Sequence, residues 1–239
     1  YLRHRLHMIL LNSLFVICIL PGPKYIATKG EVWPKPQYQE NKNMYYVLDN
    51  DTLNIKKPYY TCDILEKGIK RILHQNFARR QSYININQTQ NKHSRQHEAN
   101  LYKVNFTAHK IDFIIELNQQ CEKYPHLDMD ESYLLNVRET IVLSSASIWG
   151  ILRGLETFSQ LIYYSDDYTE MRINATIIED YPAYKHRGLL IDTGRHYLKT
   201  ETISLLIDAM EMNKMNVLHW HIVDDQSFPY QSKVLPRLR

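Results

Sequence analysis

Two stretches of the sequence are the most informative about the architecture: His186-Arg-Gly-Leu-Leu-Ile-Asp-Thr-Gly-Arg-His-Tyr-Leu198 and Asn216-Val-Leu-His-Trp-His-Ile-Val-Asp-Asp-Gln-Ser-Phe-Pro-Tyr230. In each of them a short apolar run leads directly into charged and aromatic residues. The segment between them predicts a helix that begins near Thr200, because apolar residues recur on one of its faces: Ile203, Leu206, Ile207 and Met210. This order predicts a strand–helix–strand unit with parallel strands.

The two predicted strands are Gly188–Ile191, a wholly apolar run typical of a buried parallel strand, and Val217–Val223. In a (β/α)8 TIM barrel the active site lies at the carboxyl ends of the strands, where these polar residues follow. A complete barrel needs roughly 250 residues, whereas residues 181–239 supply one such unit. We therefore expect the start of a barrel that is incomplete in this chain.

Residues 24–180 predict a separate α+β domain, in which a sheet is covered by helices, and Asp180-Tyr-Pro182 marks its end. One helix is expected over 62–77. A second is expected to be capped by Ser144 or Ser145, and its apolar stripe consists of Ile148, Leu152, Leu155 and Ile162. Residues 34–46 predict an extended lead-in, and residues 78–100 a polar loop or insertion. Strands are expected over 45–48, 110–117, 132–137, 139–144 and 171–178.

The charge balance excludes a basic surface for nucleic acid. The 239 residues carry a formal net charge of +3, from 29 Lys and Arg against 26 Asp and Glu. Without Arg3 and Arg5, which lie in a segment that we expect to be removed, 27 basic residues face 26 acidic ones. A nearly neutral chain lacks the electrostatic footprint that binding to phosphates requires.

The first 22 residues have the layout of a secretory signal peptide. The basic residues Arg3 and Arg5 precede an apolar run from Met8 to Leu20, which is too short to span a bilayer comfortably. A membrane anchor or a buried helix is the alternative interpretation. After removal of the signal we expect no membrane span, and a protein of the secretory pathway that is lysosomal or extracellular.

Glycosylation triplets and cysteines fit the same compartment. Four Asn-x-Ser/Thr acceptors occur, at Asn50, Asn87, Asn105 and Asn174. Because Cys18 lies in the signal, the mature chain keeps Cys62 and Cys121. In an oxidising compartment this pair most simply forms one disulfide. Two buried free thiols are the alternative.

The run Arg153-Gly-Leu-Glu-Thr-Phe-Ser-Gln-Leu161, together with the two stretches quoted first, resembles the eukaryotic lysosomal and secreted β-N-acetylhexosaminidases, glycoside hydrolase family 20. The resemblance is strong from Ser144 to Tyr230. It is weaker from Glu31-Val-Trp-Pro-Lys-Pro-Gln37 through the two cysteines. It implies an enzyme that removes terminal non-reducing N-acetylglucosamine or N-acetylgalactosamine from glycoconjugates.

The resemblance also implies roles for single residues. Arg195 matches the family arginine that binds the ring hydroxyls of the terminal sugar, which suits the rigid donor fork of a guanidinium; a structural ion pair is the alternative. Asp224 matches the aspartate that supports the general acid. His219 and His221 share one face of their strand and are expected to shape the pocket floor or to lie in the core. Arg187 is expected to be structural.

The family mechanism is substrate-assisted retention, which departs from the usual scheme with two catalytic carboxyl groups. The 2-acetamido carbonyl of the substrate attacks the anomeric carbon, while an adjacent Asp–Glu pair orients it and protonates the leaving oxygen. The sequence holds one Asp-Glu dipeptide, Asp130-Glu131, in the amino-terminal domain. We do not assign the catalytic role to it. We expect the chain to be an amino-terminal fragment that lacks the catalytic pair and is inactive alone.

The resemblance implies no metal or other cofactor. The implied partners are the terminal N-acetylhexosamines of oligosaccharides, glycoproteins, glycolipids or chitin fragments, and a second copy of the full-length protein in a homodimer. Two alternatives come from other classes. His219 and His221 followed by Asp224 could bind a divalent metal in a barrel hydrolase. Residues 24–180 could instead form a secreted glycan-binding or decoy module without catalysis.

Overall fold

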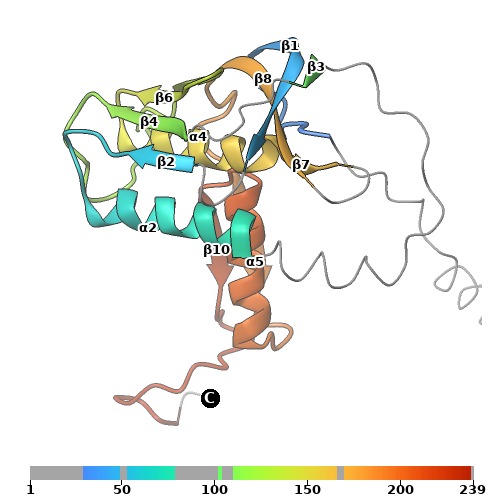
Figure 1. Cartoon of the computed structure of the whole chain (residues 1–239). Coiled ribbons are helices and arrows are strands. Elements are labelled where there is room, and N and C mark those ends of the chain that lie inside the picture. The colour runs from blue at the N-terminus through green and yellow to red at the C-terminus, as the bar shows by residue number, and fades with distance from the viewer. Residues whose placement is uncertain (1–28, 49–52, 79–101, 104–109, 166–169, 238–239) are drawn as a thin grey trace, which may run out of the picture.

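The computed structural model describes residues 29–48, 53–78, 102–103, 110–165 and 170–237. The predicted signal peptide, the polar segment after Ala78 and the acceptor residues Asn50, Asn87 and Asn105 lie outside them. The described chain forms an eight-stranded mixed sheet with two helices on one face, and a two-stranded parallel sheet with a helix of its own (Figure 1). None of the described helices is long and apolar enough to span a membrane.

The large sheet has the strand order β2-β4-β6-β5-β8-β1-β3, and β7 also pairs with β8. The pairs β2–β4, β4–β6 and β1–β3 are parallel, and the other pairs are antiparallel. The strands predicted over 110–117, 132–137, 139–144 and 171–178 are confirmed. The bounds are β1 (Tyr38–Leu48), β2 (Leu53–Lys56), β3 (Tyr102–Lys103), β4 (Ile111–Leu117), β5 (Tyr133–Val137), β6 (Ile141–Ser145), β7 (Ile162–Tyr164) and β8 (Met171–Asp180).

The core lies between this sheet and the helices α2 (Asp63–Leu73) and α4 (Ile148–Leu161), which pack against each other. A short π-helical turn, His74–Ala78, continues α2. Alternate residues of β4 are buried, as expected for a strand with one face on the core. One of them, Phe113, packs on Phe158 of α4 with 4.6 Å between ring centroids. Both helices predicted in this part of the chain are confirmed.

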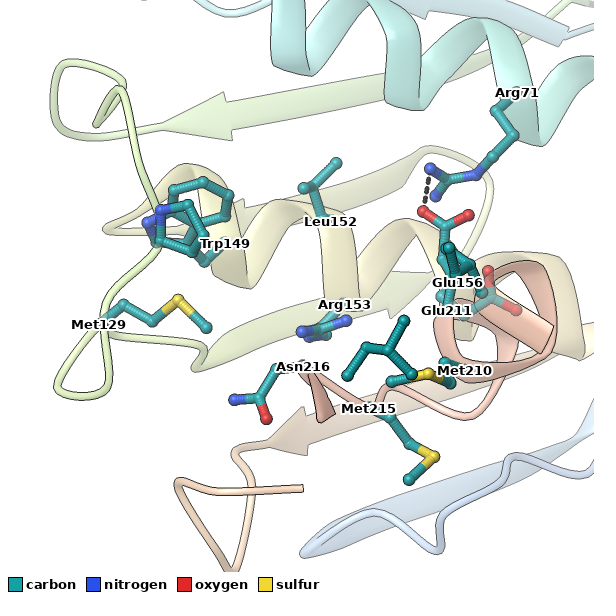
Figure 2. A pocket seen from close by; sticks show the side chains of 13 residues that line it. Arg71, Met129, Trp149, Leu152, Arg153, Glu156, Met210, Glu211, Met215 and Asn216 are labelled. Atoms are coloured by element: carbon teal, nitrogen blue, oxygen red, sulfur yellow. Dashed lines mark ion pairs between the residues drawn. The ribbon is translucent and has the colours of Figure 1, made fainter. Parts of the chain in front are cut away.

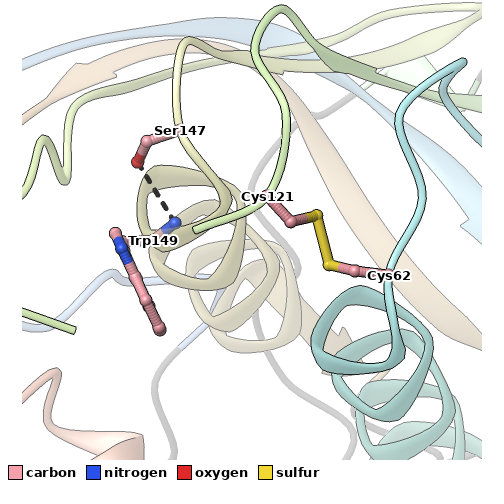
Figure 3. The surroundings of a disulfide bond; sticks show 4 residues. All are labelled: Cys62, Cys121, Ser147 and Trp149. Atoms are coloured by element: carbon pink, nitrogen blue, oxygen red, sulfur yellow. Dashed lines mark hydrogen bonds between the residues drawn. A yellow bond between two sulfur atoms is a disulfide. The ribbon is translucent and has the colours of Figure 1, made fainter. Parts of the chain in front are cut away.

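The disulfide between Cys62 and Cys121 is present (Figure 3). Cys62 immediately precedes α2, and Cys121 lies in the connection between β4 and β5. Their Cα atoms are 6.4 Å apart although 59 residues separate them in the sequence. The bond therefore ties the start of α2 to the beginning of the connection that follows β4.

Three local predictions are wrong. β1 begins at Tyr38, within the expected lead-in, because its polar half pairs through the backbone with β8 across a register shift between Asn41 and Tyr45. The cap of α4 is Ser147, whose Oγ accepts from the backbone N–H of Trp149 (3.1 Å) and Gly150 (3.2 Å). Ile162 lies in β7, so the apolar stripe of α4 ends before it.

The second sheet consists of β9 (Gly188–Asp192) and β10 (Val217–His221), joined by α5 (Thr200–Met212). The two strands are parallel, with Gly188 opposite Val217 and Asp192 opposite His221, so the predicted strand–helix–strand unit is confirmed. The expected burial of β9 is wrong for most of the strand. Ile191 is buried, whereas Leu190 is 56% exposed. Within the described residues β9 pairs with one strand only, so part of its apolar surface stays uncovered.

A buried polar joint connects the two sheets. After α5 the chain turns through Lys214, which has a positive φ of 55° and is buried. Its Nζ lies 2.6 Å from Thr157 Oγ1 in α4, 3.1 Å from the Tyr133 hydroxyl in β5 and 3.4 Å from Asp180 Oδ2 in β8. The small unit is thereby attached to a helix and two strands of the large one.

Candidate active site

The charged residues that follow β9 and β10 lie together. Arg195 Nη1 donates to Asp224 Oδ2 in an ion pair between the two loops. The Arg195 side chain is 49% exposed and the Asp224 side chain 15%. The two sequence stretches therefore place a guanidinium at the surface with a carboxylate beneath it, at the carboxyl end of the small parallel sheet.

Three further contacts hold the two loops together. The backbone N–H of Thr193 donates to His221 O (3.0 Å), and Trp220 Nε1 donates to Thr193 Oγ1 (2.8 Å). Ser227 Oγ donates to Gly194 O. These contacts extend the pairing of β9 and β10 past the strand ends, so the loops form one surface.

Asp224 is fixed on both of its oxygens. Oδ1 accepts from the backbone N–H groups of Gln226 (3.0 Å) and Ser227 (2.7 Å), and Oδ2 lies 3.4 Å from His221 Nε2 as well as accepting from Arg195. The hydrogen bond from Arg195 lowers the pKa of Asp224, and the same bond raises the pKa of Arg195. Each group therefore favours the charged form of the other.

The two histidines of β10 are placed differently. Residues two apart in a strand project to the same face, so His219 and His221 share one. The structure brings His221 to Asp224, whereas His219 is exposed farther back along the strand, opposite Leu190. Among the described residues no group of three or more His, Cys, Asp or Glu side chains is arranged to hold a metal ion.

Asp130-Glu131 lies away from this surface, at the joint between the sheets. Glu131 is buried and accepts from Arg153 Nε (2.7 Å) and from Arg187 Nη2 (2.6 and 2.8 Å). Arg187 also donates from Nε to Lys214 O (2.8 Å). A buried carboxylate held by three hydrogen bonds from two arginines has its charge paired within the fold, so Glu131 serves the packing of the two units.

A cavity of about 410 Å³ lies between α4, α5 and the start of β10 (Figure 2). Trp149, Leu152, Met210 and Met215 form much of its apolar wall, and Glu156, Arg71 and Glu211 stand at one side. Its lining includes no residue of the two loops that carry Arg195 and Asp224. The cavity is therefore separate from the candidate active site.

The sequence did not single out Asp192, Ser227 or Trp220 for this site. Asp192 Oδ1 accepts from the backbone N–H groups of Gly194 (2.9 Å) and Arg195 (3.2 Å). An aspartate at a strand end followed by Thr-Gly is a turn signal that could have indicated the first contact. The contacts of Ser227 and Trp220 cross between loops some 30 residues apart, and no local pattern indicates them.

Comparisons with known proteins agree with these features. A family model described as beta-acetyl hexosaminidase like matches residues 32–161, and one described as glycosyl hydrolase family 20, catalytic domain, matches residues 184–239. Beta-hexosaminidase subunit beta of Mus musculus is 38% identical over 237 residues, which cover 97% of this chain and 42% of that protein. Its Homo sapiens counterpart is 50% identical over 143 residues, which cover 59% of this chain and 26% of that protein.

Solved structures show the same relationship. A chitobiase from Flavobacterium johnsoniae superposes with a TM-score of 0.62 at 26% identity, covering 87% of this chain and 29% of that one. An exo β-N-acetylglucosaminidase from Vibrio harveyi, in complex with N-acetylglucosamine, shares the fold with a TM-score of 0.60 at 21% identity, covering 90% and 29%. The chain spans about two fifths of the length of its rodent relatives. It belongs to the β-hexosaminidases of glycosyl hydrolase family 20.

Proposed function

We propose that this chain forms the amino-terminal part of a β-N-acetylhexosaminidase, which removes terminal N-acetylglucosamine or N-acetylgalactosamine from glycoconjugates. The observation that carries the proposal is the ion pair of Arg195 and Asp224 at the carboxyl ends of two parallel strands. In this proposal β9, α5 and β10 are the first strands and helix of a (β/α)8 barrel, in which such residues face the substrate.

Arg195 is suited to bind vicinal hydroxyl groups of a sugar. Its guanidinium has five N–H donors in a rigid plane, and one arm is occupied by Asp224. Because the side chain is half exposed, the remaining edge can meet a ligand from solvent. Its partner keeps the guanidinium charged and limits its rotation, so a sugar that binds there finds donors already in place.

Asp224 would support the catalytic acid of the proposed reaction. In substrate-assisted hydrolysis the acetamido oxygen forms a bond to the anomeric carbon, while a glutamic acid gives its proton to the leaving glycosidic oxygen. The oxazolinium intermediate then opens when water attacks, and the glutamate takes up the proton. A neighbouring aspartate that remains ionised favours the protonated form of that glutamic acid.

The acid and the acetamido-orienting aspartate are not assigned within this chain. Glu131, in the one Asp-Glu dipeptide of the sequence, is held by Arg153 and Arg187, so we assign it to packing. We therefore propose that residues 1–239 alone bind a terminal N-acetylhexosamine and do not hydrolyse its glycoside. A longer protein containing this chain would carry out the full reaction.

We place the protein in the secretory pathway, in lysosomes or outside the cell. The disulfide supports this because disulfides persist in oxidising compartments. Of the four predicted glycosylation sites, Asn174 is described: it lies half-buried in β8, and its Oδ1 accepts from the Tyr163 hydroxyl at 2.7 Å. A glycan would be attached to the Asn174 Nδ2 atom, which does not take part in that hydrogen bond.

The test is an NMR titration of the 239-residue chain with N-acetylglucosamine and with glucose. We expect Arg195→Ala to weaken N-acetylglucosamine binding by about tenfold or more, because a charged donor to hydroxyls is lost. Arg138→Ala, which removes an exposed arginine beyond the end of β5, is the matched control and should change nothing. Equal affinity in wild type and Arg195→Ala would refute the assigned site, and measurable turnover by the chain would refute binding without hydrolysis.

A further inference from the structure

Asp192, the last residue of β9, is the acceptor at the base of the loop that carries Arg195. Its Oδ1 accepts from the backbone N–H groups of Gly194 (2.9 Å) and Arg195 (3.2 Å). Two N–H groups on one carboxylate oxygen close a tight turn directly after the strand. The direction in which the Arg195 side chain leaves the backbone therefore depends on this carboxylate.

The other oxygen of Asp192 approaches the same arginine. Oδ2 lies 3.9 Å from Arg195 Nε, while Nη1 on the far side of the guanidinium donates to Asp224. Asp224 and Asp192 both favour the charged guanidinium and raise the pKa of Arg195. A guanidinium with carboxylates near Nε and Nη1 has few rotations open to it, and Nη2 takes part in neither of these two contacts.

The turn is also confined from outside. A Cβ atom on Gly194 would lie 3.2 Å from Asp192 Oδ1 and 3.5 Å from Ile222 O, so the backbone approaches the other loop closely. The carbonyl of Gly194 accepts from Ser227 Oγ. If the hydrogen bonds to Asp192 were lost, the hydrogen bond from Ser227 to Gly194 O would still hold the turn.

We propose that Asp192 is a positioning residue for sugar recognition: it closes the 193–195 turn and orients Arg195 so that its half-exposed guanidinium meets the sugar hydroxyls. The proposal rests on the proposed function, since it concerns the same site. It predicts that acceptor geometry at position 192 matters more than charge, because the two backbone contacts require a short side chain with its oxygen at Oδ1.

Amide hydrogen exchange tests the turn without any ligand. We expect Asp192→Ala and Asp192→Glu to speed exchange at the Gly194 and Arg195 amides by about tenfold, because each variant removes or displaces the acceptor. Asp192→Asn keeps an oxygen at the same place and should stay within about threefold of wild type. Asp225→Asn removes a nearby exposed charge that makes no such contact and is the matched control.

Titration with N-acetylglucosamine tests the consequence. Affinity should fall about tenfold in Asp192→Ala and Asp192→Glu, and Asp192→Asn should restore most of it. Rescue by Glu and not by Asn would overturn the proposal, because charge alone would then be sufficient. Unchanged exchange and unchanged affinity in Asp192→Ala would also overturn it.

If the wild type binds no sugar, the proposed function fails, and the exchange pattern still decides whether Asp192 holds the turn. Should Asp192→Ala not fold, the Glu and Asn variants decide alone.

Discussion

Two carboxylates of this chain show how position sets the charge of the same chemical group. Asp224 accepts from Arg195 and from two backbone N–H groups, and the hydrogen bonds from Arg195 and from the Ser227 N–H lower its pKa. Glu156 of α4 is buried, and burial raises its pKa to about 7 despite the nearby Arg71. Its Oε2 has no hydrogen-bond partner within the described part of the chain. The first carboxylate is held ionised, and the second is easily protonated.

Glu156 should therefore contribute more stability to the folded chain as the pH falls from about 7 to about 4.5, the ordinary pKa of a glutamate. In that range the folded state holds a proton on Glu156 that the unfolded state has released. Arg71 of α2, Glu211 of α5 and Lys214 face the same group, and Gln160 on its own helix bonds to it. Glu156→Gln should remove this pH dependence and stabilise the chain at pH 8 by up to about 3 kcal/mol.

Urea unfolding at pH 5 and pH 8 measures this effect. Glu116→Gln, an exposed carboxylate in β4, is the control and should leave the pH dependence as in wild type. A Glu156→Gln variant whose stability still falls between pH 5 and pH 8 as steeply as wild type would contradict the prediction.

Among the single helices and strands, the start of α4 depends on which of three neighbouring serines caps it, and the sequence does not distinguish them. Ser144, Ser145 and Ser147 all stand before α4, and each could accept from the first N–H groups of the helix. In the structure Ser147 is the cap. The Ser145 hydroxyl is already engaged, because its Oγ donates to Ser132 O (2.7 Å) and accepts from the backbone N–H of Ser147 (3.1 Å). Pairing of β6 with β5 and β4 places Ser144 in the sheet.

Ser147→Ala should lower the free energy of unfolding by about 1–2 kcal/mol, because two N–H groups at the start of α4 lose their acceptor in a buried place. Ser144→Ala, the matched change at the position that the sequence favoured equally, should cost less than about 0.5 kcal/mol. Chemical unfolding of both variants measures the difference. Equal losses would show that capping does not distinguish the two serines.

At the scale of the whole molecule, the two sheets are joined through buried charges. Lys214 reaches α4, β5 and β8, and burial lowers its pKa while Asp180 opposes that shift. Beside it Glu131 is held by Arg153 and Arg187. This joint sets where the small unit, and with it the Arg195 site, stands relative to the large sheet.

Lys214→Met should therefore lower the stability of the chain by about 1–3 kcal/mol, because Asp180 and Thr157 lose the buried ammonium donor while the Tyr133 hydroxyl still donates to Asp180. The loss of stability in the double variant Lys214→Met/Asp180→Asn should be smaller than the sum of the losses in the two single variants. Lys199→Met, an exposed lysine immediately before α5, is the control and should have almost no effect. Thermal unfolding of wild type and the four variants measures these effects, and strictly additive losses would contradict direct pairing.

Much of the fold follows from patterns within short segments. Alternating burial in β4, the amphipathic α2 and the apolar runs of β9 and β10 are all visible in the sequence, because each depends on neighbours within one element. Helix limits and the polar half of β1 were not visible, because they depend on which partner strand supplies backbone hydrogen bonds. The exposure of Leu190 likewise depends on what covers β9.

The family and the parallel strand–helix–strand unit could be read from the order of residues alone, which also singled out the two residues of the proposed site, Arg195 for sugar binding and Asp224 for support of the catalytic acid. These features depend on residues close together in the sequence, whose motifs and periodicity can be recognised without knowing the fold. Asp192 closes its turn with residues two and three positions along the chain, whereas the pairing of Arg195 with Asp224 and the binding of Glu131 by two arginines became visible only in the folded protein. Such contacts join residues far apart in the sequence, and side-chain charge and reach alone do not specify which of many partners the packed chain brings within range.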